Sequence, residues 1–213
     1  MSRKGTPYLA LTLGMTAANM AYVLPRNPAV VVARGARHEG TLPFDRVVVP
    51  LLAACIVALM AVAGLDAVRF GWAPLPAESV VPGVLLMIAG GVPVAGALAA
   101  NPFLEPTVRL QTERGQRVVT TGPYRHVRHP MYAGQLLQHV STPLVLGSAW
   151  ALVPAACCAV LLVVRTVLED RALMRGLPVD SYPQTLLRGQ CAADEVDYLD
   201  GIATDIPSTL VPG

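Results

Sequence analysis

The segment from Val47 to Val68 contains a single charged residue, Asp66, which lies near its end. A helix that crosses a membrane needs about 20 predominantly apolar residues, and this segment has that length and composition. The sequence therefore predicts that residues 47–68 form a membrane-spanning helix.

Four other apolar segments are interrupted more often by polar or helix-breaking residues. They are residues 8–24, 80–100, 131–146 and 148–168. Segment 8–24 contains Asn19 and is followed by Pro25, and segment 80–100 contains Pro93, where we expect a kink. Gly147 and Ser148 lie where the last two segments meet, which indicates a hairpin of two helices. We therefore predict an all-α, polytopic integral membrane bundle of about five transmembrane helices.

The composition of the whole chain agrees with a membrane protein. Of its 213 residues, 54% are hydrophobic and 14% are charged, whereas a soluble domain has about 25% charged residues. The net charge of +2 is too small to indicate a nucleic-acid partner. The four cysteines lack the spacing of a metal site or a thioredoxin-like motif, so we predict no metal and expect them to pack in the bundle or face lipid.

The basic residues are concentrated in the loops. Loop 26–46 contains four Arg and loop 101–130 contains five, whereas the link 69–79 contains one. Because cytoplasmic loops carry an excess of Lys and Arg, we expect both basic loops in the cytoplasm, with a short interfacial helix in the first. The final hairpin then returns the chain to the cytoplasm, where a soluble tail begins at Glu169. This topology places Arg3 and Lys4 outside.

The densest polar stretch runs from Gly122 to Gly134, immediately before and into the fourth apolar segment. Its two prolines each fix a φ angle and keep the preceding residue out of the α region. The stretch is therefore stiff and holds Tyr124, His129 and Tyr132 in a fixed geometry at the head of a helix. Pro130 suits the first helical position, which leaves the N–H groups of the next turn free for a ligand. These side chains indicate either a cofactor pocket at the membrane surface or an interfacial anchor.

A second polar group lies at the end of the last apolar segment, which the hairpin returns to the same membrane face. Arg165 and Glu169 are four residues apart and share one helix face, and Asp170 follows. An Arg at membrane depth is a functional hypothesis by default. Arg165 either binds an anionic substrate group, with Glu169 accepting hydrogen bonds from a ligand, or the two form an ion pair at a helix end.

The remaining polar candidates are weaker. Gln111 stands out among loop charges that we expect to be solvated, and His139 indicates a hydrogen-bonded contact between helices. The chain has no GxGxxG motif, no Walker-type glycine loop and no nucleophile elbow. Methyl transfer from S-adenosylmethionine needs none of these, because the sulfonium is already electrophilic and the protein mainly aligns the acceptor.

Two motifs carry a resemblance to a known family. The run from Val118 to Gly134, followed by Arg165-Thr166-Val167-Leu168-Glu169-Asp170, resembles the isoprenylcysteine carboxyl methyltransferase family, which is related to the membrane phospholipid methyltransferases. The resemblance covers roughly residues 18–178 and is closest to bacterial members. It implies a multi-pass enzyme of the bacterial inner membrane that binds S-adenosylmethionine in a cytoplasmic pocket formed by the final helices and the tail.

The resemblance also implies roles for particular residues. Glu169 would hold the cofactor, and Arg165 would orient the acceptor carboxylate. The residues that would line or flank the cofactor are Gln111, Gln116, Arg117, Val118, Val119, Tyr124, His129, Pro130, Met131 and Tyr132.

The family pattern stops near Leu177-Pro178, which divides the chain into a membrane methyltransferase domain, residues 1–178, and a divergent cytoplasmic tail, residues 179–213. The predicted acceptor is the carboxylate of a lipid-like or prenylated molecule of the isoprenylcysteine type, and membrane lipids are the other expected partners. Two alternatives stay open. One is methylation of a phospholipid amine, and the other is a non-catalytic membrane protein that keeps the scaffold.

Overall fold

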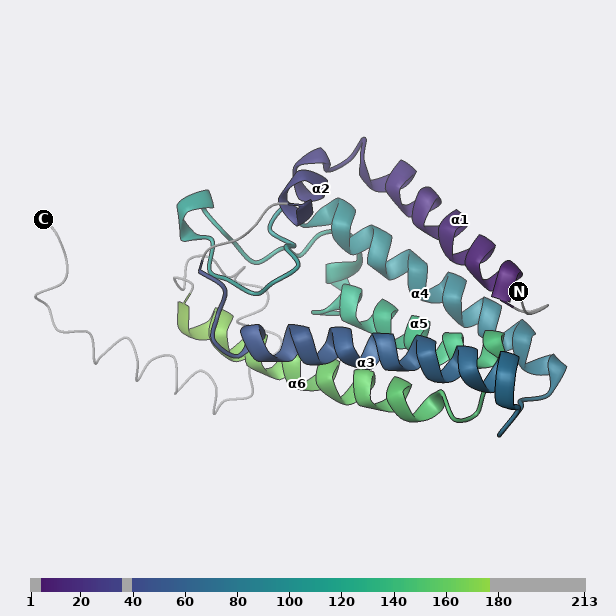
Figure 1. Cartoon of the computed structure of the whole chain (residues 1–213). Coiled ribbons are helices and arrows are strands. Elements are labelled where there is room, and N and C mark those ends of the chain that lie inside the picture. Colours follow the sequence, from purple (N-terminus) through teal and green to yellow (C-terminus); the bar gives the residue numbers. More distant parts are fainter. Residues whose placement is uncertain (1–4, 36–39, 177–213) are drawn as a thin grey trace, which may run out of the picture.

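The computed structural model describes residues 5–35 and 40–176. The predicted tail 179–213, the Leu177-Pro178 pair, Arg3 and Lys4 lie outside these residues. The described part is all-α, as predicted, and contains six α-helices and no β-sheet (Figure 1). The helices are α1 (Gly5–Val23), α2 (Pro28–Gly35), α3 (Asp45–Leu65), α4 (Val80–Ala100), α5 (Pro130–Leu146) and α6 (Leu152–Gly176).

Each of the five predicted apolar segments forms a helix, and α2 is the short helix expected in the first basic loop. One boundary differs in a way that matters for function. The last helix was predicted to end at Leu168, whereas α6 continues to Gly176. Residues 169–175 are mostly good helix formers, and Gly176 is the first glycine or proline after Pro154. Glu169 and Asp170 are therefore fixed on a helix.

Within residues 5–35 and 40–176, three helical segments are long and apolar enough to cross a membrane. They are Asp45–Phe70, which joins α3 to a π-helical turn, Ala77–Ala100, which contains α4, and Leu152–Gly176, which is α6. By length and composition they indicate a multi-pass membrane protein. Helices α1 and α5, which we also predicted to span, do not meet these criteria.

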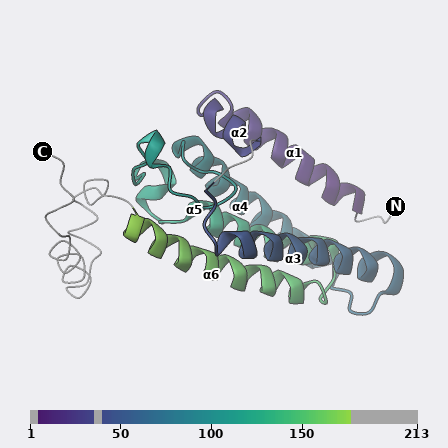
Figure 2. The ribbon, with the colours of Figure 1, turned by 60° about the vertical axis from the view of Figure 1, so that its left-hand side comes forward.

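The two ends of the bundle have different character (Figures 1 and 2). At one end, the link after α3 is tied to the turn between α5 and α6. Ala149 N–H donates to Ala73 O at 2.9 Å, and Leu75 N–H donates to Gly147 O at 3.0 Å. Buried Asp66 accepts hydrogen bonds from Ser148 Oγ at 2.5 Å and from Ala73 N–H at 3.1 Å. We call this the turn end.

The opposite end, which we call the loop end, gathers the start of α3, the end of α4, the start of α5 and the end of α6 (Figure 1). The long polar loop between α4 and α5 folds over it. A core cluster holds the four helices together just below this loop. Its buried members are Leu52, Ala97, Met131, Tyr132, Cys158 and Leu162. The core therefore fixes Tyr132 at the boundary between the apolar bundle and the polar loop.

Helices α4 and α5 pack closely through small residues. A Cβ atom at Gly134 would collide with the backbone oxygen of Gly90, and one at Gly90 would collide with that of Gly134. Small residues at such a crossing allow the two backbones to approach. This contact fixes the axis of α5, and thus the position of its first turn.

Candidate active site

The candidate site begins at the first turn of α5. Pro130 is its first residue, as predicted, and His129 precedes it without making a side-chain cap. The N–H groups of the first turn of a helix have no intrahelical partners. The backbone at Met131 and Tyr132 therefore offers donors with a positive helix-dipole end.

Two hydrogen bonds join this turn to the end of α6. Tyr132 Oη donates to Glu169 Oε2 at 2.5 Å, and His129 Nε2 lies 2.7 Å from Asp170 Oδ1. The His129 and Tyr132 rings are parallel, with centroids 5.5 Å apart. The structure thus brings together side chains that are 37 and 41 positions apart in the sequence. Glu169 and Asp170, adjacent on α6, therefore contact Tyr132 and His129 at the start of α5.

The surroundings of His129 favour its protonated form. Burial lowers its pKa, but the hydrogen bond that His129 donates to Asp170 and the charges of Glu169 and Asp170 outweigh that effect, so the pKa is raised above its ordinary value. The site therefore combines two carboxylates with one imidazole that retains its proton to higher pH than a free histidine.

Tyr124 lies beside this group on the loop. Asn101 Nδ2 donates to its hydroxyl oxygen at 3.2 Å, and its ring packs against the core cluster below the loop. Burial raises the pKa of Tyr124 to about 12, with a smaller contribution from the charge of Glu169. Tyr124 is therefore a neutral hydroxyl at any physiological pH.

Arg165 has a partner that the sequence did not indicate. Its Nε donates to Asp45 Oδ1 at 2.8 Å and its Nη2 to Asp45 Oδ2 at 2.9 Å. The Arg165 side chain is 6% exposed and the Asp45 side chain is not exposed at all. The predicted alternative of an ion pair with Glu169 is thus replaced by a pair between α6 and the first residue of α3. An Arg at membrane depth needs an acidic partner, but Asp45, two residues before the apolar segment predicted from Val47, is not marked as that partner by any local pattern.

The same guanidinium reaches toward the rest of the site. Its carbon lies 5.3 Å from the centroid of the Tyr132 ring. Nη2 also donates to Pro106 O at 2.7 Å, and Nη1 makes no hydrogen bond within the described part of the chain. One guanidinium nitrogen is therefore left for a ligand.

Gln111 and Gln116 serve the loop itself. Gln111 is 1% exposed, and its Nε2 donates to Phe103 O at 2.8 Å. Its Oε1 accepts from Arg114 Nη1 at 2.6 Å, and its backbone N–H donates to Gln116 Oε1 at 2.7 Å. These bonds fold the loop back on itself rather than joining the pair to Tyr132 or Glu169.

The next three predicted residues follow this turn in an irregular stretch. Arg117 is exposed, and Val118 and Val119 are half-buried. On the same loop, buried Glu105 accepts from Arg109 at 2.6 and 3.1 Å and from Arg114 at 3.1 Å. The loop is thus held by internal ion pairs while it lies over the helix ends.

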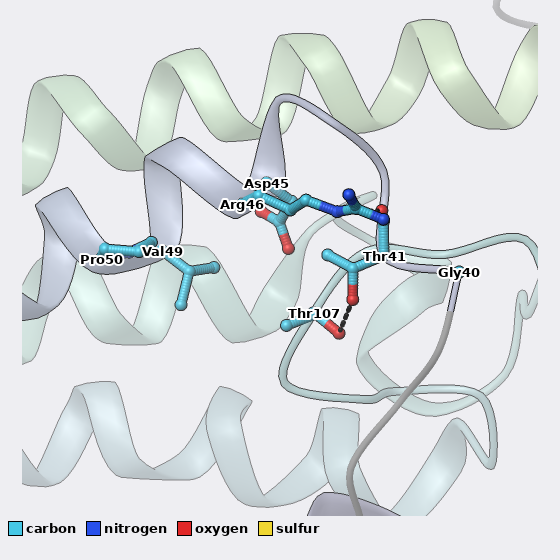
Figure 3. A pocket seen from close by; sticks show the side chains of 7 residues that line it. All are labelled: Gly40, Thr41, Asp45, Arg46, Val49, Pro50 and Thr107. Carbon is cyan, nitrogen blue, oxygen red and sulfur yellow. Dashed lines mark hydrogen bonds between the residues drawn. The ribbon is translucent and has the colours of Figure 1, made fainter.

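A cavity of about 550 Å³ opens at the start of α3 (Figure 3). The residues that line it are Gly40, Thr41, Asp45, Arg46, Val49, Pro50 and Thr107. Thr41 Oγ1 donates to Thr107 Oγ1 at 3.2 Å, and Arg46 Nε donates to Thr41 O at 3.1 Å. None of these residues was a predicted site residue. The cavity meets the predicted site only through Asp45, which contacts Arg165.

The fold and these contacts define a class: a helical membrane protein with a buried polar site at one end of its bundle. Residues 102–175 match the isoprenylcysteine carboxyl methyltransferase (ICMT) family. The chain therefore carries an ICMT family domain over these residues, which confirms the resemblance for this part of the chain, while its extension to residues 18–101 stays a prediction. The match begins just after α4 and includes all the predicted site residues, but not Asp45. No curated protein and no solved structure matches the chain.

Proposed function

We propose that this protein is an integral membrane methyltransferase that moves a methyl group from S-adenosylmethionine to the carboxylate of a lipid-like acceptor of the isoprenylcysteine type. One observation carries the proposal: within the ICMT family domain, Tyr132–Glu169 and His129–Asp170 join the first turn of α5 to α6.

The donors and acceptors of the site fit the charged end of S-adenosylmethionine, which carries an ammonium, a carboxylate and a sulfonium. The carboxylates of Glu169 and Asp170 suit the cationic groups. The uncapped N–H groups at Met131 and Tyr132 suit the carboxylate. When bound, the cofactor supplies an electrophilic methyl group, so the protein needs no nucleophile of its own.

The residues of the chain then have distinct tasks. Tyr132 donates to Glu169 and so fixes the carboxylate that holds the cofactor. Arg165 directs its free Nη1 toward the acceptor carboxylate and orients it. Such an acceptor is already ionised at neutral pH, so no general base is required. The remaining predicted residues, Gln111 and Gln116–Val119, shape the loop that covers the site and excludes water.

The connectivity of the bundle supports α5 as a fourth membrane crossing, in addition to the three long apolar segments. Helix α4 ends at the loop end, whereas α6 begins at the turn end, beside Ala73. Helix α5 joins these two ends and so crosses the same thickness, about 26 Å for its 17 residues. It tolerates polar residues such as Gln138 and His139 because α4 and α6 cover it. The Arg-rich loops then face the cytoplasm of a bacterial cell, with the site beside them.

Methylation of a phospholipid amine is the second candidate, and the structure strengthens it. The cation at Arg165 argues against an amine acceptor, but Asp45 neutralises that cation. The two carboxylates of the site would also suit an ammonium group. An assay of methyl transfer to a prenylated cysteine analogue and to phosphatidylethanolamine separates the two reactions.

The proposal is tested by titrating S-adenosylhomocysteine into the purified protein in detergent by calorimetry. Glu169→Ala and His129→Ala should weaken binding by about tenfold, because each removes one charged contact. Glu113→Ala is the matched control, since that carboxylate is 54% exposed on the same loop. Equal affinity in the wild type and all three variants would rule out the site, and no binding by folded wild-type protein would favour the non-catalytic alternative.

A further inference from the structure

We infer that Asp45, on α3 and outside the ICMT family domain, is a positioning residue that holds Arg165 in the orientation needed for methyl transfer. The inference rests on the proposed function and adds a residue to it. Asp45 bonds Arg165 directly, and its proposed effect passes through that residue.

The geometry of the pair is specific. Both oxygens of Asp45 accept from Arg165, through Nε at 2.8 Å and Nη2 at 2.9 Å. A two-point contact between a carboxylate and a guanidinium fixes the plane of the guanidinium as well as its distance. Since Nε and Nη2 are both engaged, the direction in which Nη1 points is determined by Asp45.

Asp45 also binds the loop between α4 and α5. Its Oδ2 accepts from Val108 N–H at 2.6 Å, and Leu42 N–H donates to Val108 O at 2.9 Å. Arg165 Nη2 adds the bond to Pro106 O. One carboxylate therefore joins α3, α6 and the loop that carries Tyr124 and His129.

The charge balance gives Asp45 a second role. A buried guanidinium without a partner is unfavourable and turns toward any available acid. Glu169 is one helical turn away on the same helix, and Tyr132 already occupies one of its oxygens. With Asp45 present, Arg165 is satisfied without Glu169, which leaves Glu169 free to hold the cofactor.

A purely structural role for Asp45 is the competing explanation, and the chain offers a matched control. Asp66 lies at the other end of the segment that begins with Asp45, and it is 1% exposed. It also accepts one backbone N–H and one side-chain donor. Asp66→Asn therefore removes an equally buried carboxylate charge at the turn end, far from the site.

The experiment compares Asp45→Asn, Asp45→Glu and Asp66→Asn with the wild type, at a temperature where all four are folded. Steady-state methyl transfer gives kcat and the KM for the acceptor. We expect Asp45→Asn to lower kcat/KM for the acceptor by about tenfold or more. Asp66→Asn should stay within about twofold of the wild type. Asp45→Glu, which keeps the carboxylate, should recover part of the loss.

The outcomes separate this inference from the proposed function. If the wild type neither binds S-adenosylhomocysteine nor transfers a methyl group, the proposed function fails and the positioning role fails with it. If the wild type is active and Asp45→Asn retains its kcat/KM, or loses no more than Asp66→Asn, only the positioning role is overturned. A loss confined to Asp45→Asn with recovery in Asp45→Glu supports it.

Discussion

Breaking the Asp45–Arg165 pair should destabilise the folded protein far more than breaking an exposed pair. The Asp45 side chain is 0% exposed and the Arg165 side chain 6%. Removing one partner of a buried pair leaves an uncompensated charge, which costs about 3–5 kcal/mol. For a chain of this size, 1 kcal/mol shifts Tm by about 2–4 °C. Asp45→Asn or Arg165→Gln alone should therefore lower Tm by about 6–20 °C.

The double variant Asp45→Asn/Arg165→Gln should lose much less stability than the sum of the two single variants, because no buried charge is left unpaired. The assay is thermal unfolding of all four proteins in one detergent, arranged as a double-mutant cycle. Glu113→Gln, at the exposed partner of Arg109, provides the control and should leave Tm unchanged within error. Additive effects of the two single substitutions would refute the reasoning, because they would mean that the two charges do not interact.

Three further predictions concern other parts of the molecule. Because the pKa of His129 is raised, its pairing with Asp170 stabilises the protein fully below the ordinary histidine pKa of about 6.5, and this stabilisation is lost as pH rises through the higher folded value. The Tm difference between wild type and Asp170→Asn should therefore be largest at acidic pH. A Tm difference that is independent of pH would contradict this prediction. Gly134→Ala should disrupt the packing of α4 on α5 and lower Tm, whereas Gly64→Ala, with no atom within 4 Å of the new Cβ, should be neutral or mildly stabilising. Gln111→Ala removes the side chain that bonds Phe103 and Arg114 and should cost about 1–3 kcal/mol, with equal Tm for wild type and variant counting against a structural role.

The helices were predictable because their signal is local. Apolar length alone located α3, α4 and α6, and the glycine at Gly147 marked the hairpin. The sequence prediction ended the last helix at Leu168, because Glu169 and Asp170 are charged residues that follow an apolar segment. Charge does not end a helix by itself, and α6 continues through Glu169 and Asp170 to Gly176.

The site was predictable only in part, because its contacts join residues that are distant in the sequence. The stiff stretch before α5 and the acids on α6 could be assigned to one membrane face from hairpin topology. The partner of Arg165 could not, since Asp45 is 120 positions away and nothing local distinguishes it from an ordinary first-turn acid. For Gln111, the type and place of the residue indicated importance, but the structure shows that its hydrogen bonds serve the loop.

The concentration of polar contacts at the loop end has a physical reason. Each helix of the bundle presents a mainly apolar surface, so hydrogen-bonding side chains are tolerated only where the backbone leaves the apolar zone. Asp45 at the start of α3 and Arg165 near the end of α6 meet at this boundary, where the low-dielectric side strengthens their attraction. The same boundary gives Tyr132 and Glu169 a dry setting on one side and the polar loop on the other. The proposed sulfonium donor and amphiphilic acceptor would need those two surroundings side by side, which is why we propose that the start of α3 belongs to the site together with the two motifs in the ICMT family domain.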